Sequence, residues 1–362
     1  MDEPVDKVEQ AKRDKIAAFW QRAAPLKPFL DDDDVTEIMV NRVGELVIER
    51  RNGEQTAVAC PEITLDFLQG IGNRLANLGT KSFDAQHPEL TAKLPTGERV
   101  SMTHPPMCPD DVRYMNIRKH TGIAFTHKHL IDSGYYTHTR HEYSLSLSDE
   151  ERERIAKHLP EEELELWELA KSGRIPEFVE KAVKYYQNIV ISGATGSGKT
   201  SYMRALIEMI NTEDRIITVE DTPEMPLPNH PNNNSLFYKK NEKDDGALPE
   251  DVLHACMRKT PKRVLLAELR GNEAMSYLSG VLSSGHPGGI TTTHAGSPKA
   301  AKLRLALLIL QSKAGQALTF DTVMMLLHMS VDVVIQLNRS REKGRHVPAI
   351  YYDPMYRLSL LD

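Results

Sequence analysis

Cysteine is scarce in this chain of 362 residues, and the three that occur are scattered. Cys60, Cys108 and Cys256 are odd in number, and none of them falls at a spacing typical of structural zinc ligands. The sequence therefore excludes a disulfide-stapled scaffold, and we expect free thiols in a reducing compartment.

Long apolar runs are also absent. No stretch of about 18 apolar residues occurs, so the sequence predicts no membrane span. The first residues, Met-Asp-Glu-Pro, lack the charged and then apolar pattern of a signal peptide. We therefore expect a cytoplasmic protein, which would reach a membrane only through partners or an amphipathic surface.

Basic charge is not in excess. The chain has 45 Lys and Arg residues against 51 Asp and Glu residues, a net charge of −6. Proteins that coat DNA or RNA are usually basic, so this composition disfavours that class. Hydrophobic residues at 40% are typical of a globular protein, and the length is enough for two domains.

The strongest positive signal is the octet Gly-Ala-Thr-Gly-Ser-Gly-Lys-Thr at 193–200. It follows the apolar run 189–191 and precedes a stretch with helical spacing, which is the context of a P-loop. Glycines let the backbone curl so that its N–H groups surround an anion. Lys199 would then reach the β- and γ-phosphates, and the Thr200 hydroxyl would ligate Mg²⁺.

An accidental glycine-rich turn is the weaker interpretation, because a strand and a helix flank the octet in the required order. We predict a nucleotide site made by Gly193, Ala194, Thr195, Gly196, Ser197, Gly198, Lys199, Thr200 and Ser201.

The whole chain, P-loop included, divides by composition into four parts. Residues 1–24 are expected to form an N-terminal helix, and 25–123 a small α+β domain with a hairpin at 35–50 and a helix at 65–78. Residues 124–172 are expected to be a linker. Residues 173–362 alternate strand and helix, which predicts a parallel sheet. The strands are expected at 188–192, 216–220, 263–267, 289–293 and 331–337, with a closing hairpin that ends at 352 and a long surface excursion at 226–246.

Acidic residues follow the predicted strand at 216–220. Glu220 ends this strand, and Asp221 and Glu224 come after it. The carboxyl ends of parallel strands face the ligand crevice of an open α/β sheet. Glu220 would bind Mg²⁺, and Glu220 or Asp221 would orient the attacking water. The alternative is that Asp221 only caps a turn.

A second acid follows the apolar run 264–267. Glu268 stands where many P-loop proteins place an aspartate, and a glutamate can activate a hydrolytic water. Arg270 would stabilise γ-phosphate charge or contact a neighbouring subunit, and an ion pair with Glu273 has equal weight. His294 follows the next strand and would sense the γ-phosphate, although a lone histidine there is more often structural.

Four boxes in this order resemble the hexameric traffic ATPases of type IV secretion and plasmid conjugation. The boxes are the P-loop at 193–200, the acidic box at 220–224, the Walker B box at 266–271 and the histidine box at 293–298. The amino-terminal half fits as well, and the resemblance covers nearly all of 25–355. The resemblance is greatest to the conjugative-plasmid members of TrwD type.

The resemblance implies a RecA-like P-loop NTPase domain preceded by a PAS-like domain, assembled as a homo-hexamer. Arg99 and Arg118 would approach the nucleotide from the amino-terminal domain. Glu268 would activate the water, although Glu220 remains an alternative for this role.

The resemblance also implies Mg²⁺-dependent ATP hydrolysis at the cytoplasmic face of the bacterial inner membrane. The partners would be inner-membrane secretion ATPases and other type IV secretion components, with transient peripheral membrane association and no sequence-specific binding of nucleic acid. Two other functions stay open, namely a RecA-like nucleic-acid translocase and a nucleotide-gated scaffold. Salt-dependent binding of single-stranded DNA would indicate the translocase.

Overall fold

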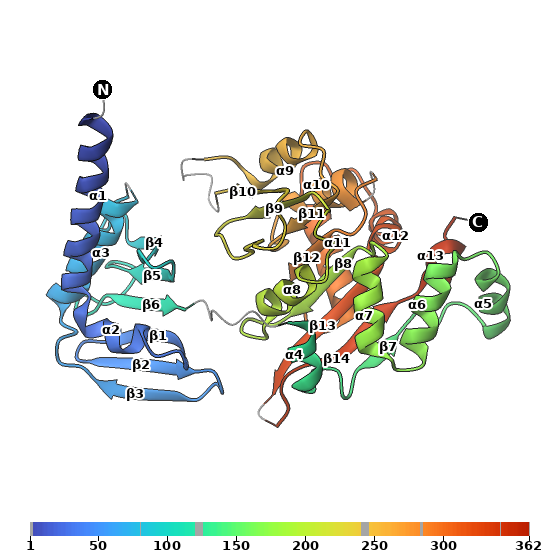
Figure 1. Ribbon diagram of the computed structural model, residues 1–362, viewed down its shortest axis with the longest axis horizontal. Coiled ribbons are helices and arrows are strands. Elements are labelled where there is room, and N and C mark those ends of the chain that lie inside the picture. Colours follow the sequence, from blue (N-terminus) through green and yellow to red (C-terminus); the bar gives the residue numbers. More distant parts are fainter. Residues whose placement is uncertain are drawn as a thin grey trace. The chain divides into compact units, whose positions relative to one another are not determined.

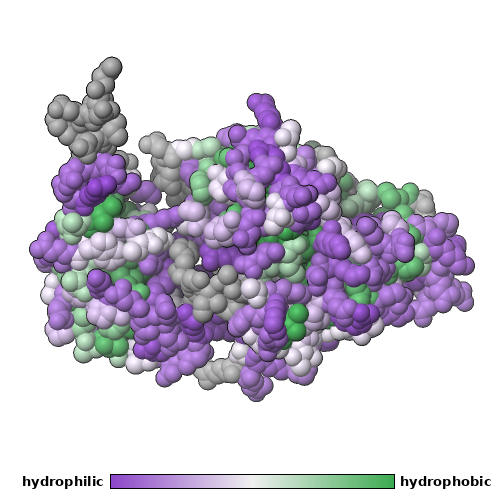
Figure 2. All heavy atoms as spheres, viewed as in Figure 1, coloured by the Kyte–Doolittle hydropathy of each residue, from purple (hydrophilic) through white to green (hydrophobic). Residues whose placement is uncertain are grey.

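The computed structural model describes residues 3–79, 81–119, 126–239, 246–282, 285–340 and 342–361, with only the backbone of residues 3–8. The chain folds into two compact units, 1–123 and 124–362 (Figure 1). The boundary between them, at 123/124, falls among residues outside these ranges. No helix in the described ranges is long and apolar enough to cross a membrane, and the face drawn in Figure 2 is mostly hydrophilic.

The first unit is a six-stranded antiparallel sheet covered by helices. The strand order is β3-β2-β1-β6-β5-β4. The strands are β1 (Val35–Arg42), β2 (Glu45–Arg50), β3 (Gln55–Ala59), β4 (Glu89–Lys93), β5 (Arg99–Thr103) and β6 (Tyr114–Arg118), and the helices are α1 (Glu3–Arg22), the 3-10 turn η1 (Ala24–Leu26), α2 (Lys27–Leu30) and α3 (Leu65–Leu78).

Local sequence explains these elements well. The Thr64 hydroxyl accepts a hydrogen bond from the Phe67 N–H and so caps α3 at its first turn. The apolar face of α3 then packs with Phe19 of α1 and with alternate residues of the sheet in one core. The predicted hairpin and helix are confirmed in this unit.

The second unit holds an eight-stranded sheet in the order β10-β9-β11-β12-β8-β13-β14-β7. The first six strands in this order run parallel, β14 is antiparallel to β13, and β7 is parallel to β14. The strands are β7 (Arg140–Glu142), β8 (Ile189–Gly193), β9 (Ile216–Glu220), β10 (Asn233–Phe237), β11 (Arg263–Leu266), β12 (Ile290–Thr293), β13 (Val333–Ser340) and β14 (Gly344–Tyr352).

Two cores lie on the two faces of this sheet, because alternate residues of each buried strand point to opposite sides. Ile189 and Ile191 join one core and Val190 joins the other. The first core takes α4 (His127–Asp132), α5 (Asp149–Ala156), α6 (Glu161–Lys171), α7 (Ile175–Lys184), α8 (Lys199–Ile207) and α13 (Pro354–Ser359), and the second takes α9 (Pro249–Met257), α10 (Glu273–Tyr277), the π-turn η2 (Leu278–Leu282), α11 (Pro298–Gln311) and α12 (Phe320–Ser330). The predicted α/β class with a parallel sheet and a smaller α+β domain is confirmed.

The structure differs from the predicted linker at 124–172. In its described part, Leu130, Tyr136 and Trp167 are buried in the core of the second unit, and β7 adds a strand to the sheet. Arg152 of α5 also forms an ion pair with Asp353, at 2.9 Å between Nη1 and Oδ1. Sequence periodicity missed this because the elements are short and their partners lie about two hundred residues away in the chain.

The predicted surface excursion at 226–246 is also wrong in part. Residues 233–237 form β10, which pairs in parallel with β9. The proline, asparagine and lysine content of this segment predicts a loop, but an edge strand has one neighbour and tolerates polar residues, here Asn233 and Asn234. Residues 240–245 of the excursion lie outside the described ranges.

Candidate nucleotide site

The P-loop joins the carboxyl end of β8 to the first residue of α8. Gly196 and Gly198 have φ values of +76° and +94°, a region that residues with a side chain rarely adopt. A Cβ added to Gly193 would lie 2.4 Å from the Ser197 hydroxyl. Three positions of the octet therefore require glycine, because of backbone conformation or of close approach.

A buried serine hydroxyl indicates that the loop fits a phosphate group. Ser197 is 1% exposed, and its hydroxyl has no hydrogen-bond partner among the described residues. A buried hydroxyl without a partner is unfavourable, and a phosphate oxygen would satisfy it. The loop also lies at the amino terminus of α8, where the helix dipole favours an anion.

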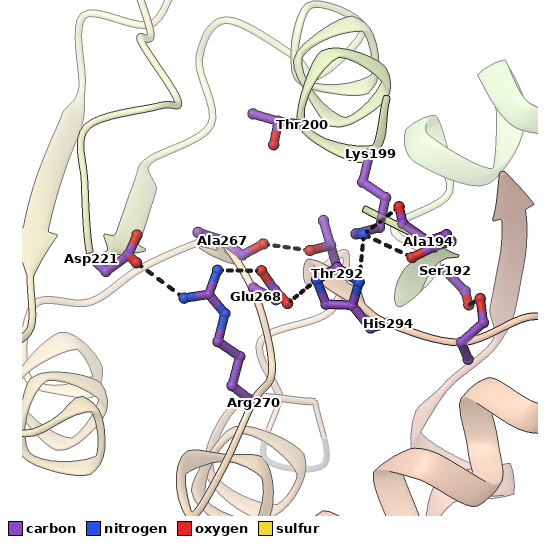
Figure 3. A network of polar contacts seen from close by, with 12 residues as sticks. Ser192, Ala194, Lys199, Thr200, Asp221, Ala267, Glu268, Arg270, Thr292 and His294 are labelled. Carbon is purple, nitrogen blue, oxygen red and sulfur yellow. Dashed lines mark hydrogen bonds and ion pairs between the residues drawn. The ribbon is translucent and has the colours of Figure 1, made fainter. Parts of the chain in front are cut away.

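Lys199 lies folded against its own loop (Figure 3). Its ammonium group donates to the carbonyl oxygens of Gly193 at 2.8 Å and Ala194 at 3.2 Å, and it lies 3.2 Å from His294 Nδ1. Lysine is a donor only, so Nδ1 accepts this hydrogen bond. The imidazole proton is then on Nε2, as assigned from the contacts.

His294 connects the P-loop to the Walker B strand. Its Nε2 atom lies 2.8 Å from Glu268 Oε1. Burial lowers the pKa of His294, and the cations Lys199 and Arg270 lower it further, whereas Glu268 raises it. A histidine with a lowered pKa is neutral near pH 7, as the acceptor role of Nδ1 requires.

Arg270 links the two acidic boxes. Its Nη2 donates to Glu268 Oε2 at 2.5 Å, and its Nη1 donates to Asp221 Oδ2 at 3.2 Å. The alternative ion pair between Arg270 and Glu273 is not formed by the guanidinium group. Instead, Glu273 Oε1 accepts from the backbone N–H groups of Arg270 and Gly271. Asp221, Arg270, Glu268, His294 and Lys199 thus make one continuous chain of polar contacts (Figure 3).

Glu220 lies at the turn that follows β9. It is buried, and its carboxylate accepts from the Thr218 hydroxyl at 2.9 Å and from the backbone N–H groups of Glu224 and Met225 at 2.6 and 2.8 Å. Burial raises the pKa of Glu220, and these hydrogen bonds oppose the rise. These hydrogen bonds hold Glu220 at the turn after β9, and its roles at Mg²⁺ and at the attacking water stay predictions.

Glu224 of the same acidic box lies beside Thr200 of the P-loop. Its Oε2 accepts from the Thr200 hydroxyl at 3.3 Å. A hydroxyl and a carboxylate oxygen beside the phosphate loop fit Mg²⁺, which prefers oxygen ligands and usually keeps several waters. No group of three or more His, Cys, Asp or Glu residues in the described ranges could hold a metal by itself. The sequence signal for Glu224 was its place in the same acidic box.

Arg99 and Arg118 belong to the first unit. They lie directly opposite one another on β5 and β6, and Lys93 stands opposite Arg99 on the other side. Arg118 is also 3.8 Å from Glu37 of β1, measured from Nε to Oε1. Like charges that face each other across strands repel, and Glu37 offsets part of this repulsion at Arg118.

The comparisons with known proteins agree on one family. A family model described as "Type II/IV secretion system protein" matches residues 156–349. The type IV secretion system protein VirB11 of Brucella suis is 36% identical over 357 residues, which cover 97% of this chain and 95% of that protein. The type IV secretion system protein PtlH of Bordetella pertussis is 33% identical and covers 95% of this chain and 98% of its own length.

Solved structures give the same result. The VirB11 ATPase of the Brucella suis type IV secretion system, crystallised in complex with sulphate, matches at a TM-score of 0.53 and 34% identity over 97% of this chain and 99% of that one. The pilus retraction motor PilT with bound ADP matches at a TM-score of 0.51 over 90% and 82%, and its 14% identity shows the fold alone. The fold is thus a RecA-like ATPase domain preceded by a smaller amino-terminal domain. The chain belongs to the type II/IV secretion system protein family, and the relatives named here include VirB11-type secretion ATPases.

Proposed function

We propose that this chain is the ATP-hydrolysing motor of a type IV secretion or conjugation apparatus. It would power pilus biogenesis and the transfer of protein or DNA–protein substrates across the inner membrane. The observation that carries the proposal is the continuous set of contacts from Lys199 through His294, Glu268 and Arg270 to Asp221. These contacts connect the phosphate loop to a carboxylate that can activate water, along the same edge of the sheet.

The residues act through charge and position. A nucleotide phosphate on the loop competes with the Gly193 and Ala194 carbonyls for the Lys199 ammonium, because a charged acceptor binds an ammonium group more strongly than a neutral carbonyl does. His294 then loses its donor at Nδ1 and is free to reorient. Glu268, whose Oε2 accepts from Arg270, takes the proton of the attacking water.

Two further contributions belong to this proposal. Mg²⁺, which Thr200 and Glu224 would hold, neutralises phosphate charge when bound. Arg99 and Arg118 of the first unit would contribute positive charge to nucleotide binding. The assembly would be a homo-hexamer at the cytoplasmic face of the inner membrane, in contact with other secretion ATPases and components.

Substitution of Lys199 tests the activity. Lys199→Ala should lower phosphate release by the purified full chain at least about a hundredfold, because the phosphates lose a preorganised cation. Lys184→Ala, at an exposed position at the end of α7, is the matched control and should hydrolyse ATP like the unaltered chain. Near-normal turnover in Lys199→Ala would refute the motor. Failure of the same variant to restore transfer in cells that lack their own secretion ATPase would connect hydrolysis to secretion.

A further inference from the structure

Two arginines of the closing hairpin lie against the P-loop, and neither belongs to one of the four sequence boxes. Arg339 of β13 and Arg345 of β14 are directly opposite one another across the hairpin. Arg345 Nε donates a long hydrogen bond, 3.4 Å, to the carbonyl oxygen of Gly196. The stem of Arg345 also packs on the loop, because a Cβ added to Gly198 would lie 3.0 Å from Arg345 Cδ.

Arg339 approaches the loop from the same hairpin. Its guanidinium Nη1 would lie 3.7 Å from a Cβ placed on Gly196. Both arginines therefore come close to the apex of the loop, on the side where the glycines leave room. Each guanidinium group brings a positive charge close to the loop, and a polyphosphate bound on the loop would be attracted to both.

The position of Arg345 is set by buried contacts two residues further along β14. The Val347 N–H donates to the Tyr135 carbonyl at 2.8 Å, and the Val347 carbonyl accepts from the Thr139 hydroxyl at 2.6 Å. Val347 itself is 1% exposed. The segment before α5 thus anchors β14, and β14 in turn carries Arg345 to the loop.

The contact of Arg345 suits the geometry of a phosphate loop. The N–H groups of such a loop point inward to the anion, so some of its carbonyl groups point outward. A cation on an outward carbonyl holds the loop in the curled conformation and adds charge that favours an anion inside it. Arginine is suited to this because its planar group donates in several directions and keeps its charge.

We propose that Arg345 is a positioning residue for nucleotide binding, and that Arg339 and Arg345 together form a second cationic wall of the phosphate site, supplied by the same chain. The wall acts on affinity for the polyphosphate rather than on the chemical step. This inference rests on the proposed function, since it takes a nucleoside triphosphate as the ligand of the P-loop.

Binding of a fluorescent ATP analogue to the purified full chain tests the inference. Arg345→Ala should raise the Kd about tenfold, the effect of losing one charge-assisted hydrogen bond. Its kcat at saturating ATP should stay near that of the unaltered chain, and its binding should depend less on salt because one cation is missing. Arg345→Lys keeps the charge and should recover part of the affinity. Lys343→Ala removes the same charge at an exposed position of the turn and should change nothing.

The outcomes distinguish failure of the proposed function from failure of this inference alone. If the unaltered chain does not bind the analogue, the proposed function fails and this inference fails with it. If the unaltered chain binds and Arg345→Ala binds equally well, only the second cationic wall is refuted. It is refuted as well if Arg345→Ala lowers kcat with an unchanged KM, or if it lowers the melting temperature without nucleotide as much as it weakens binding, because the arginine would then act on the chemistry or on the fold.

Discussion

At the scale of single residues, Glu268 has a polar contact at each of its carboxylate oxygens. Its two carboxylate oxygens contact His294 and Arg270, at 2.8 and 2.5 Å, so its orientation is defined by neighbours from other segments. Glu220 differs, because its Oε2 accepts from two backbone N–H groups of the turn after β9. The two glutamates, which sequence reasoning left as alternatives, are thus distinguished by their hydrogen-bond partners.

Glu268→Gln should keep ATP binding and lose turnover. The amide has nearly the same size as the carboxylate but cannot accept the proton of the water, so kcat should fall by about 10² to 10⁴-fold. Fluorescent-nucleotide binding and phosphate release, measured on the same preparation, check this. Glu208→Gln, at an exposed position after α8, is the control. Loss of binding in Glu268→Gln would instead make Glu268 a structural residue.

At the scale of elements, the segment that carries α5 is an integral part of the second unit. Arg152 of α5 pairs with Asp353 at the start of α13 and also donates to the Ser144 carbonyl. Its guanidinium lies 4.8 Å from the ring centre of Tyr143 and 5.4 Å from that of Trp167. The Arg152 and Asp353 side chains are 9% and 0% exposed, so the pair is buried and each charge depends on the other.

Arg152→Ala should destabilise the second unit by about 3–5 kcal/mol, because it leaves the buried Asp353 carboxylate without its cation. The chain has two tryptophans, Trp20 and Trp167, and a Trp20→Phe background makes urea unfolding followed by fluorescence specific to the second unit. Arg154→Ala, exposed on the same helix, is the control. A loss below about 1 kcal/mol, the range of a surface ion pair, would show that this segment is held weakly.

At the scale of the whole molecule, the first unit adds a row of basic residues to a chain whose second unit already carries the P-loop. Each unit has its own core, and each presents two arginines directly opposite one another on paired strands, Arg99 with Arg118 and Arg339 with Arg345.

We expect the full chain to assemble into six copies in the presence of a non-hydrolysable ATP analogue and Mg²⁺. A nucleotide that binds the assembled form more tightly than the single chain shifts the equilibrium toward the assembly by mass action. Light scattering after size-exclusion chromatography, with and without nucleotide, measures the assembly. A strict monomer under both conditions would contradict the ring while leaving the ATPase activity to be judged by the Lys199→Ala variant.

The sequence by itself determined the features that are local in the chain. The P-loop, the acids after β9 and β11 and the histidine after β12 are each read from a few consecutive residues, and an apolar run predicts the buried strand that precedes them. The parallel sheet follows from the alternation of such runs with helices. The confirmed fold class and the confirmed family rest on this local information.

Only the tertiary structure decided which side chains meet. It assigned Glu220 to a turn and placed Glu224 beside Thr200, brought Arg345 to Gly196 across 149 positions of the chain, and packed Trp167 into the core. These contacts depend on strand order and on the pairing of β14 with β13 and β7. Strand order is set by the burial of both sheet faces together, a property of the whole chain that no short stretch of residues carries.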